Sequence, residues 1–280
     1  MKIKITTDST SDLSPALLEK HNISVLPLTI VKGDEGFKDR VTITPAEIFK
    51  HVAAGGDLCS TTAINIGEYE EFFDKLSAEY DGIIHINIGS HFSSCHQNAS
   101  LAAEDFPKVR TVDSKNLTTG QGLVVLKACQ LAETCTDLDA MKAELDAYAE
   151  KIETSFLLDQ LKYMVKGGRC SMVAALGANL LNLKPCIEVK DGKLTVVKKY
   201  RGSYEKCLSN YIKDRLDNRD DIDHTTLFVT RTPVSESGEK AVSQAIEECE
   251  SFENIYWTEA GCTVSCHCGP GTLGVIFVRK

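Results

Sequence analysis

The sequence lacks any run of about twenty consecutive apolar residues, the length that crosses a bilayer. It also lacks an apolar segment ahead of Asp8 of the kind that directs secretion. Positive charge is scarce as well: 31 Lys and Arg stand against 40 Asp and Glu, and the formal charge of -9 repels phosphate backbones and anionic membrane surfaces. We therefore expect a cytoplasmic protein without a nucleic-acid partner and without stable membrane insertion.

Paired cysteine motifs are also missing. The 11 cysteines are scattered from Cys59 to Cys268 without the framework of a disulfide-stapled secreted domain, so most should be reduced. One local cluster, Cys262, Cys266, His267 and Cys268, could suggest zinc. If this segment is extended, however, Cys266 and Cys268 face one way and His267 the other. No second CxxC supports a metal, so we predict neither a metal nor a cofactor.

Repeats, low-complexity tracts and flexible linkers are absent, and 280 residues suffice for two compact units. Up to about residue 155, predicted strands alternate with predicted helices. The strands cover residues 2–6, 23–31, 82–88 and 109–112. One helix is expected to start near Pro15, and a second covers 67–80. A third follows a DSKN cap at 113–116, and a fourth runs to about Glu153. This alternation predicts a largely parallel α/β sheet with flanking helices.

Beyond Ser155 the pattern changes to short strands and glycine turns. Asp191-Gly192 predicts a hairpin between strands at 186–189 and 194–200. Further strands are expected at 225–230, 255–258 and 273–278, and helices at 203–217 and 235–250. We predict an N-terminal α/β domain at 1–155 and a C-terminal α+β domain at 156–280.

Three polar loops lie next to strands or helices of the first domain: 8–12 (DSTSD), 60–65 (STTAIN) and 89–99 (GSHFSSCHQNA). In open α/β sheets, ligands bind beyond the carboxyl ends of the strands. Hydroxyl groups near helix N-termini can bind a carboxylate or phosphate there. Helix capping is the alternative for Ser9, Thr10 and Ser11, and also for Thr61 and Ser93.

A further loop is predicted at 161–171, LKYMVKGGRCS. Its paired glycines permit a positive φ and bring Lys166 and Arg169 onto one turn. A solvated basic turn without a ligand is the alternative.

Several motifs together resemble the DegV family of bacterial fatty-acid-binding proteins. They are TTDSTSDL, LKYMVKGGRCS, LNLKPCIEVKDGKL at 181–194, Tyr200-Arg201-Gly202 and HCGPGTLGV. The resemblance spans almost the whole chain. It implies two α/β domains with a long-chain fatty acid, such as palmitate, held between them as cargo. Some family members present the acid to a separate fatty acid kinase that phosphorylates its carboxylate, which implies a kinase subunit as a possible partner.

The resemblance also implies site residues. By position, Thr61 and Ser93 match carboxylate-binding hydroxyls, Thr62 adjoins them, and His267 of the HxGPG motif matches a histidine beside the same head group. Secondary ligand-binding or partner-facing positions fall on Ser9, Ser94, Arg169, Arg201 and Gly269. The sequence departs from the family pattern at Ala63-Ile64-Asn65 and at Ser94-Cys95-His96, which alters the pocket wall. His96 is either a second imidazole or a surface substitution.

The leading hypothesis is a non-catalytic carrier of a long-chain fatty acid in lipid transport or fatty acid metabolism. An acyl hydrolase using Ser93, Asp113 and His267 is the alternative, because these residues occur in the chain order of α/β-hydrolases. Phe92-Ser93-Ser94 lacks the G-x-S-x-G elbow, however, and Asp113 is as easily a helix cap. A phosphate-binding domain built on the KGGR and GPG turns ranks last, since no Walker or dinucleotide fingerprint is present.

Overall fold

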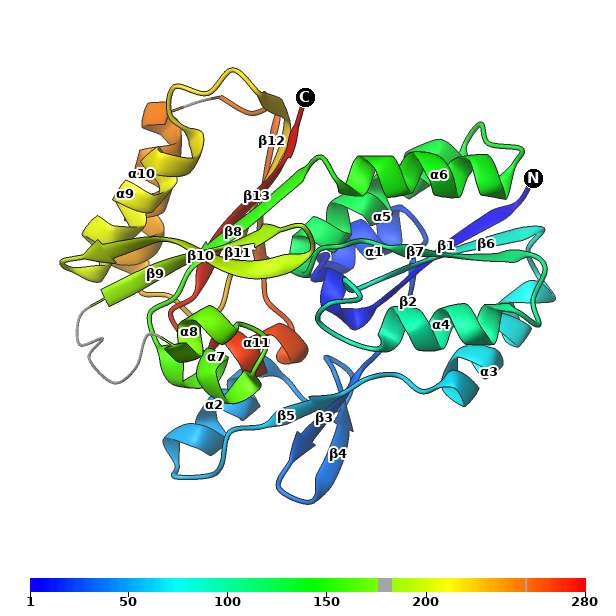
Figure 1. Cartoon of the computed structure of the whole chain (residues 1–280), viewed down its shortest axis with the longest axis horizontal. Coiled ribbons are helices and arrows are strands. Elements are labelled where there is room, and N and C mark those ends of the chain that lie inside the picture. Colours follow the sequence, from blue (N-terminus) through cyan, green and yellow to red (C-terminus); the bar gives the residue numbers. More distant parts are fainter. Residues whose placement is uncertain (176–182, 250) are drawn as a thin grey trace.

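The computed structural model describes residues 1–175, 183–249 and 251–280. It comprises two α/β lobes, which lie side by side in Figure 1, and a small three-stranded sheet next to them. The motif at 181–194 and the predicted helix at 235–250 are covered except for Leu181, Asn182 and Glu250, which lie outside the described residues.

The first lobe contains a four-stranded parallel sheet in the order β2-β1-β6-β7. Its strands are β1 (Ile3–Asp8), β2 (Ser24–Leu26), β6 (Gly82–Asn87) and β7 (Val109–Asp113). Its helices are α1 (Pro15–Lys20), α3 (Ile66–Ser77), α4 (Cys95–Ala103), α5 (Thr118–Ala132) and α6 (Leu138–Ala149). β6 is buried on both faces: Ile84 and Ile86 pack in the core with α5 and α6, while Ile83 joins the core with α3 and α4. Burial on both faces is typical of parallel sheets, and it confirms the predicted fold class for this lobe.

The second lobe contains a six-stranded mixed sheet in the order β10-β9-β8-β13-β11-β12. Its strands are β8 (Ile152–Leu157), β9 (Leu183–Lys190), β10 (Lys193–Arg201), β11 (Ile222–Arg231), β12 (Asn254–Glu259) and β13 (Leu273–Arg279). Helices α9 (Tyr204–Leu216) and α10 (Glu236–Cys249) pack together beside it. The predicted hairpin is confirmed: Asp191 (φ 50°) and Gly192 (φ 71°) turn the chain between β9 and β10, with the positive φ values of a type I′ turn.

The third sheet was not predicted. It pairs β3 (Thr29–Lys32) with β4 (Glu35–Lys38) and β5 (Ser60–Thr62), and α2 (Pro45–Ala53) connects β4 to β5. The prediction of one strand over 23–31 is wrong, because β2 and β3 belong to different sheets. Pro27 lies between them, and proline has no N–H with which to continue a ladder.

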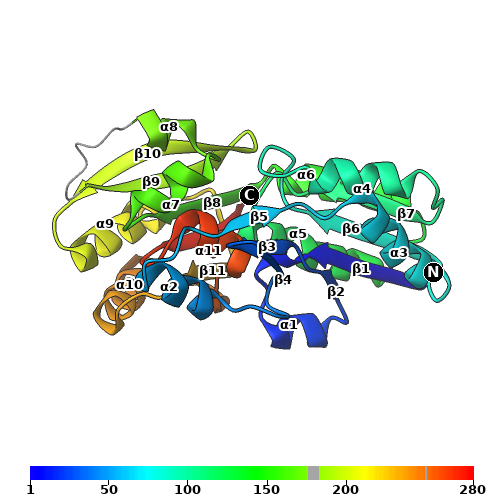
Figure 2. The same cartoon turned by 90° about the horizontal axis from the view of Figure 1, so that it is seen from below.

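Two more predictions are corrected. The predicted loop at 161–171 is largely helical: α7 (Leu161–Gly167) is followed by the C-cap residue Gly168, whose φ is 68°, and then by α8 (Ser171–Ala175). The segment Cys262–Cys268 is not extended but forms helix α11, which contacts α7, α2 and β5. Figure 2 shows β5 running alongside α11, although about 200 residues separate them in the chain.

The proposed division into domains at residue 155 falls within β8, which belongs to the second sheet. The preceding helix, α6, ends at Ala149 rather than near Glu153, because β8 already begins at Ile152. The boundary itself stays a prediction. In the part of the chain that is described, we find no helix of the length and apolarity required to span a bilayer.

Candidate functional site

A cavity of about 410 Å³ is lined by residues of both lobes. The N-terminal half of the chain contributes Leu28, Thr61, Thr62, Ala63, Ile88, Phe92, Ser93, Ser94, Asn98 and Leu117. The C-terminal half contributes Phe156, Met164, Arg169, Leu194, Thr263, Val264, His267 and Cys268. The volume lies in the range of about 300–1,000 Å³ that small-molecule pockets occupy.

Thr61 and His267 meet in this cavity. The Thr61 hydroxyl on β5 lies 3.0 Å from Nε2 of His267 on α11. Burial, and secondly the charge of Arg169, lower the pKa of His267 from 6.5 to about 4. The imidazole is therefore neutral near pH 7, and one of its two nitrogens carries a proton. Its Nδ1 atom is buried and has no hydrogen-bond partner among the residues described.

Helix α11, which carries His267, is held by two buried carboxylates from the N-terminal half of the chain. Asp39 accepts hydrogen bonds from the backbone N–H groups of Cys262 (2.8 Å) and Thr263 (3.1 Å), and from the Thr263 hydroxyl (2.6 Å). These bonds satisfy donors that the first turn of a helix leaves without partners. A negative charge at this end also complements the helix dipole.

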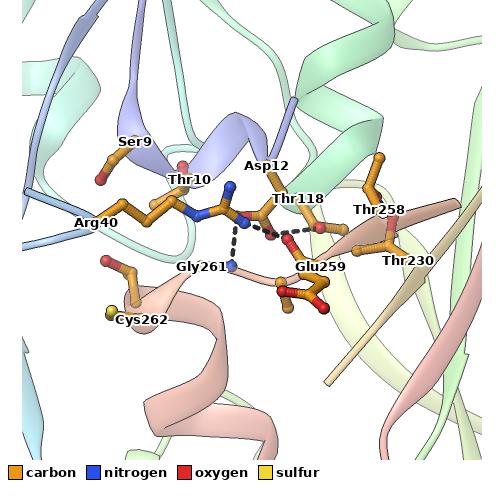
Figure 3. A network of polar contacts seen from close by, with 12 residues as sticks. Ser9, Thr10, Asp12, Arg40, Thr118, Thr230, Thr258, Glu259, Gly261 and Cys262 are labelled. Atoms are coloured by element: carbon orange, nitrogen blue, oxygen red, sulfur yellow. Dashed lines mark hydrogen bonds and ion pairs between the residues drawn. The ribbon is translucent and has the colours of Figure 1, made fainter. Parts of the chain in front are cut away.

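Asp12 is the second carboxylate, and it accepts from Gly261 N–H (2.7 Å) and from the Thr118 hydroxyl (2.6 Å). Figure 3 shows Asp12 between these donors and Arg40, whose guanidinium lies 3.4 Å from it. Burial raises the pKa of Asp12 to about 7, against the lowering effect of Arg40. The N-terminal end of α11 is thus held by two carboxylates that lie about 220 to 250 residues earlier in the chain.

Ser93 and Ser94 line the same cavity, directly before α4. The Ser93 hydroxyl accepts from the backbone N–H of Cys95 at 3.2 Å. Ser93 therefore has a local structural role at the start of α4 and also lines the cavity, and a ligand-binding role for its hydroxyl stays a prediction. Thr62 and Ser94 are exposed at the cavity, whereas Thr61 and Ser93 are half-buried.

Arg169 contributes a positively charged side chain to the cavity lining. Its Nη1 donates to the carbonyl oxygen of Gly167 at 2.6 Å, and the residue is exposed. A second, more open hollow of about 390 Å³ shares Phe92, Arg169 and Leu194 with the first and adds Lys193. Arg169 therefore lies where the cavity adjoins the surface.

Three predicted positions are not among the described residues that line the cavity: Ser9, Arg201 and Gly269. Ser9 is buried, donates to Asp39 and accepts from Leu28 N–H, both at 3.1 Å. Gly269 has φ 75°, and a Cβ there would collide with the Tyr163 ring. Arg201 is exposed at the end of β10. Ser9 and Gly269 thus support neighbouring segments, and a ligand or partner role for the three stays a prediction.

The structure does not arrange Ser93, Asp113 and His267 as the catalytic triad that the hydrolase alternative requires. Asp113 Oδ1 accepts from the N–H groups of Ser90 (3.1 Å) and Lys115 (2.9 Å), and His267 pairs with Thr61 rather than with Ser93. A triad needs an acid on the histidine nitrogen that faces away from the nucleophile. Within the described ranges, no acid bonds to Nδ1 of His267. Asp113 is not a helix cap either: α5 begins after Leu117, with no side-chain cap, so the DSKN prediction is wrong.

His96 lies half-buried on α4 and is not among the described residues lining the cavity. Burial lowers its pKa. In the described parts of the chain, no group of three or more His, Cys, Asp or Glu side chains is arranged to hold a metal ion. Sequence reasoning missed the apolar lining and both carboxylates under α11. Asp12 lies in the polar loop at 8–12, where its sequence neighbours do not reveal its distant partners, and Asp39 follows a strand that was not predicted.

Comparison with known proteins identifies the family. Residues 2–280 match the family model described as "Uncharacterised protein, DegV family". A DegV domain-containing protein of Clostridium acetobutylicum is 32% identical, with 100% of this chain and 99% of that protein covered. The chain therefore belongs to the DegV family.

Solved structures agree with this assignment. A DegV family protein of Thermus thermophilus, described for its fatty acid binding, is 27% identical with a TM-score of 0.89, and both chains are covered completely. A DegV lipid-binding protein of Thermotoga maritima is 23% identical with a TM-score of 0.86 over 100% of both chains, which shows the shared fold.

Proposed function

We propose that the protein binds one long-chain fatty acid, such as palmitate, in the cavity between its lobes and acts as a non-catalytic carrier. The hydrocarbon lies against the apolar lining, and the carboxylate meets Thr61, Ser93 and His267, with Thr62 and Ser94 beside them. The observation that carries this proposal is a cavity that combines the Thr61–His267 pair with an extensive apolar wall. The fatty acid binding described for the Thermus thermophilus relative supports it.

The chemistry of the lining suits such a ligand. A sixteen-carbon acid that is fully enclosed gains about 11 kcal/mol before the costs of association, from about 0.8 kcal/mol for each methylene. A carboxylate left without partners in an apolar cavity is strongly disfavoured, so hydroxyl and imidazole donors are needed at one end. The tail therefore supplies affinity, and the polar groups decide orientation and ligand class.

A finer part of the proposal concerns the partner. We propose that the carboxyl end is presented to a fatty acid kinase subunit through the surface around Arg169. Arg169 is both exposed and part of the cavity lining, so one guanidinium can face ligand and partner. Arg201 is exposed at the opposite end of β10 from the Lys193 and Leu194 that border Arg169, so it would contact a partner at a separate place.

Native mass spectrometry of the purified protein tests the carrier function. We expect one bound acyl chain that organic extraction releases as a free fatty acid. A protein that carries no acyl ligand, and that binds neither palmitate nor oleate after delipidation, would overturn the proposal. Hydrolysis of a p-nitrophenyl acyl ester that disappears in Ser93→Ala would favour the hydrolase instead.

A further inference from the structure

One glycine stands where a side chain would displace the imidazole of the site. Gly167 is the last residue of α7, and α7 packs against α11, the helix that carries His267. A Cβ built on Gly167 would overlap Nδ1 of His267 and lie 3.3 Å from Cγ and 3.4 Å from Cε1. The end of α7 therefore packs against the Nδ1 side of the imidazole, opposite to the Nε2 atom that faces Thr61.

This contact bears on the direction of the Thr61–His267 hydrogen bond. Nδ1 is buried with no hydrogen-bond partner in the described structure, while Nε2 lies 3.0 Å from the Thr61 hydroxyl. A buried N–H without an acceptor is rarer in proteins than an acceptor without a donor. The proton of the neutral ring therefore belongs on Nε2. His267 then donates to Thr61, and the Thr61 hydroxyl keeps its own proton for a ligand.

We propose that Gly167 is a positioning residue of the head-group site: because it has no side chain, α7 can close over His267 and hold its Nε2–H on the Thr61 hydroxyl. This inference rests on the proposed function and deepens it. The backbone conformation of Gly167 does not explain the glycine, because its φ lies outside the positive range, unlike the φ of 68° at Gly168. Helix propensity does not explain it either, since alanine is preferred inside a helix.

The test is a double-mutant cycle on palmitate affinity, measured by titration calorimetry with the delipidated full chain. Gly167→Ala should weaken palmitate binding about tenfold, because it misplaces one hydrogen bond in a network that meets a charged group. In a His267→Ala background the same substitution should have no further effect, since the space of the imidazole is free. Equal losses in both backgrounds, or no loss in either, would overturn the proposal.

Gly67→Ala is the matched control. Gly67 lies in α3, outside the cavity lining, and its added Cβ would make only an ordinary 3.4 Å contact with Asn65. Palmitate affinity should stay unchanged in this variant.

A second readout does not need a fatty acid. Long-range ¹H–¹⁵N spectra of the ligand-free protein should show His267 as the Nε2–H tautomer, and Gly167→Ala should shift its ring signals while Gly67→Ala does not. If palmitate fails to bind but these spectra change as expected, the proposed function is wrong and the positioning role stands. An unshifted His267 ring in Gly167→Ala rejects the positioning role.

Discussion

The polar and the apolar residues of the cavity wall are held in place by different means. Apolar residues such as Leu28, Leu117 and Phe156 belong to one hydrophobic core cluster that spans both lobes. Thr61 and His267 come from a short strand and a short helix, and their two side chains meet through one hydrogen bond. The apolar wall is therefore a product of folding itself, whereas the polar end depends on a few long-range contacts. This difference predicts that changes to the wall or tail have larger effects than changes at the polar end.

The largest effect should come from shortening the ligand. Decanoate has six methylenes fewer than palmitate, and at about 0.8 kcal/mol each its binding should be weaker by about 5 kcal/mol, more than a thousandfold. Titration calorimetry at one pH with both acids measures this difference. Affinities within tenfold of each other would mean that the apolar wall contributes little.

The next largest effect concerns the wall. Phe156 is 4% exposed on β8 and lines the cavity. Phe156→Ala should lower the free energy of unfolding by about 3–5 kcal/mol, the usual loss for a buried phenylalanine. Urea unfolding followed by circular dichroism measures it. Ser94→Ala, at an exposed position of the same cavity, is the control and should change stability by no more than about 0.5 kcal/mol. Similar values for both variants would show that the buried apolar wall contributes no more to folding than the exposed polar residues of the cavity.

A smaller effect is expected at the polar end. Thr61→Val keeps the shape of the side chain but removes its hydroxyl. Palmitate affinity should fall by about 10- to 100-fold, since a hydrogen bond to a charged group contributes about 1.5–3 kcal/mol. Hexadecanol, which has no charge, should lose less affinity. Ser60→Ala, at the exposed preceding residue of β5, should leave both ligands unaffected. Equal losses for acid and alcohol would show that Thr61 does not face the carboxylate.

The smallest effect on binding is that of pH. His267 is neutral well above its lowered pKa of about 4, so protonation of the imidazole should not change palmitate affinity between pH 6.5 and pH 8, a range in which Asp12, with its pKa of about 7, does titrate. A tenfold stronger affinity at pH 6.5 that persists in Asp12→Asn would show instead that an imidazolium binds the ligand.

Stability should respond to His267 with a definite sign. The unfolded chain regains the ordinary pKa of 6.5 and binds more protons than the folded chain between pH 6.5 and 4, so this contribution to stability is present above 6.5 and lost as pH falls to 4. His267→Asn should remove one loss of unfolding free energy between pH 7 and pH 5, so the variant should lose less stability, or gain more, than the unmodified protein over this range in urea. Asp12, whose raised pKa of about 7 acts in the opposite direction, is common to both proteins. An unchanged slope would contradict the burial of the ring.

Elements with a local signal were predictable. The strand at 82–88 is rich in isoleucine, and Asp191-Gly192 supplies the two residues that tolerate positive φ in a two-residue hairpin. Elements that depend on distant partners were not. β5 has three residues and is defined by its pairing with β3, while α11 has seven residues and is capped by Asp39. A helix of that length has little stability alone, so its own residues cannot specify it.

The order of motifs along the chain was enough to indicate the family and to propose Thr61, Ser93 and His267 as candidate site residues. Only the tertiary structure decided that Thr61 and His267 share a hydrogen bond and that Gly167 contacts the imidazole. It also decided that Ser9 is buried and donates to Asp39 rather than lining the cavity. The reason is physical: hydrogen bonds and close packing depend on distances in space, and residues some 100 or 200 positions apart acquire those distances only when the whole core has folded.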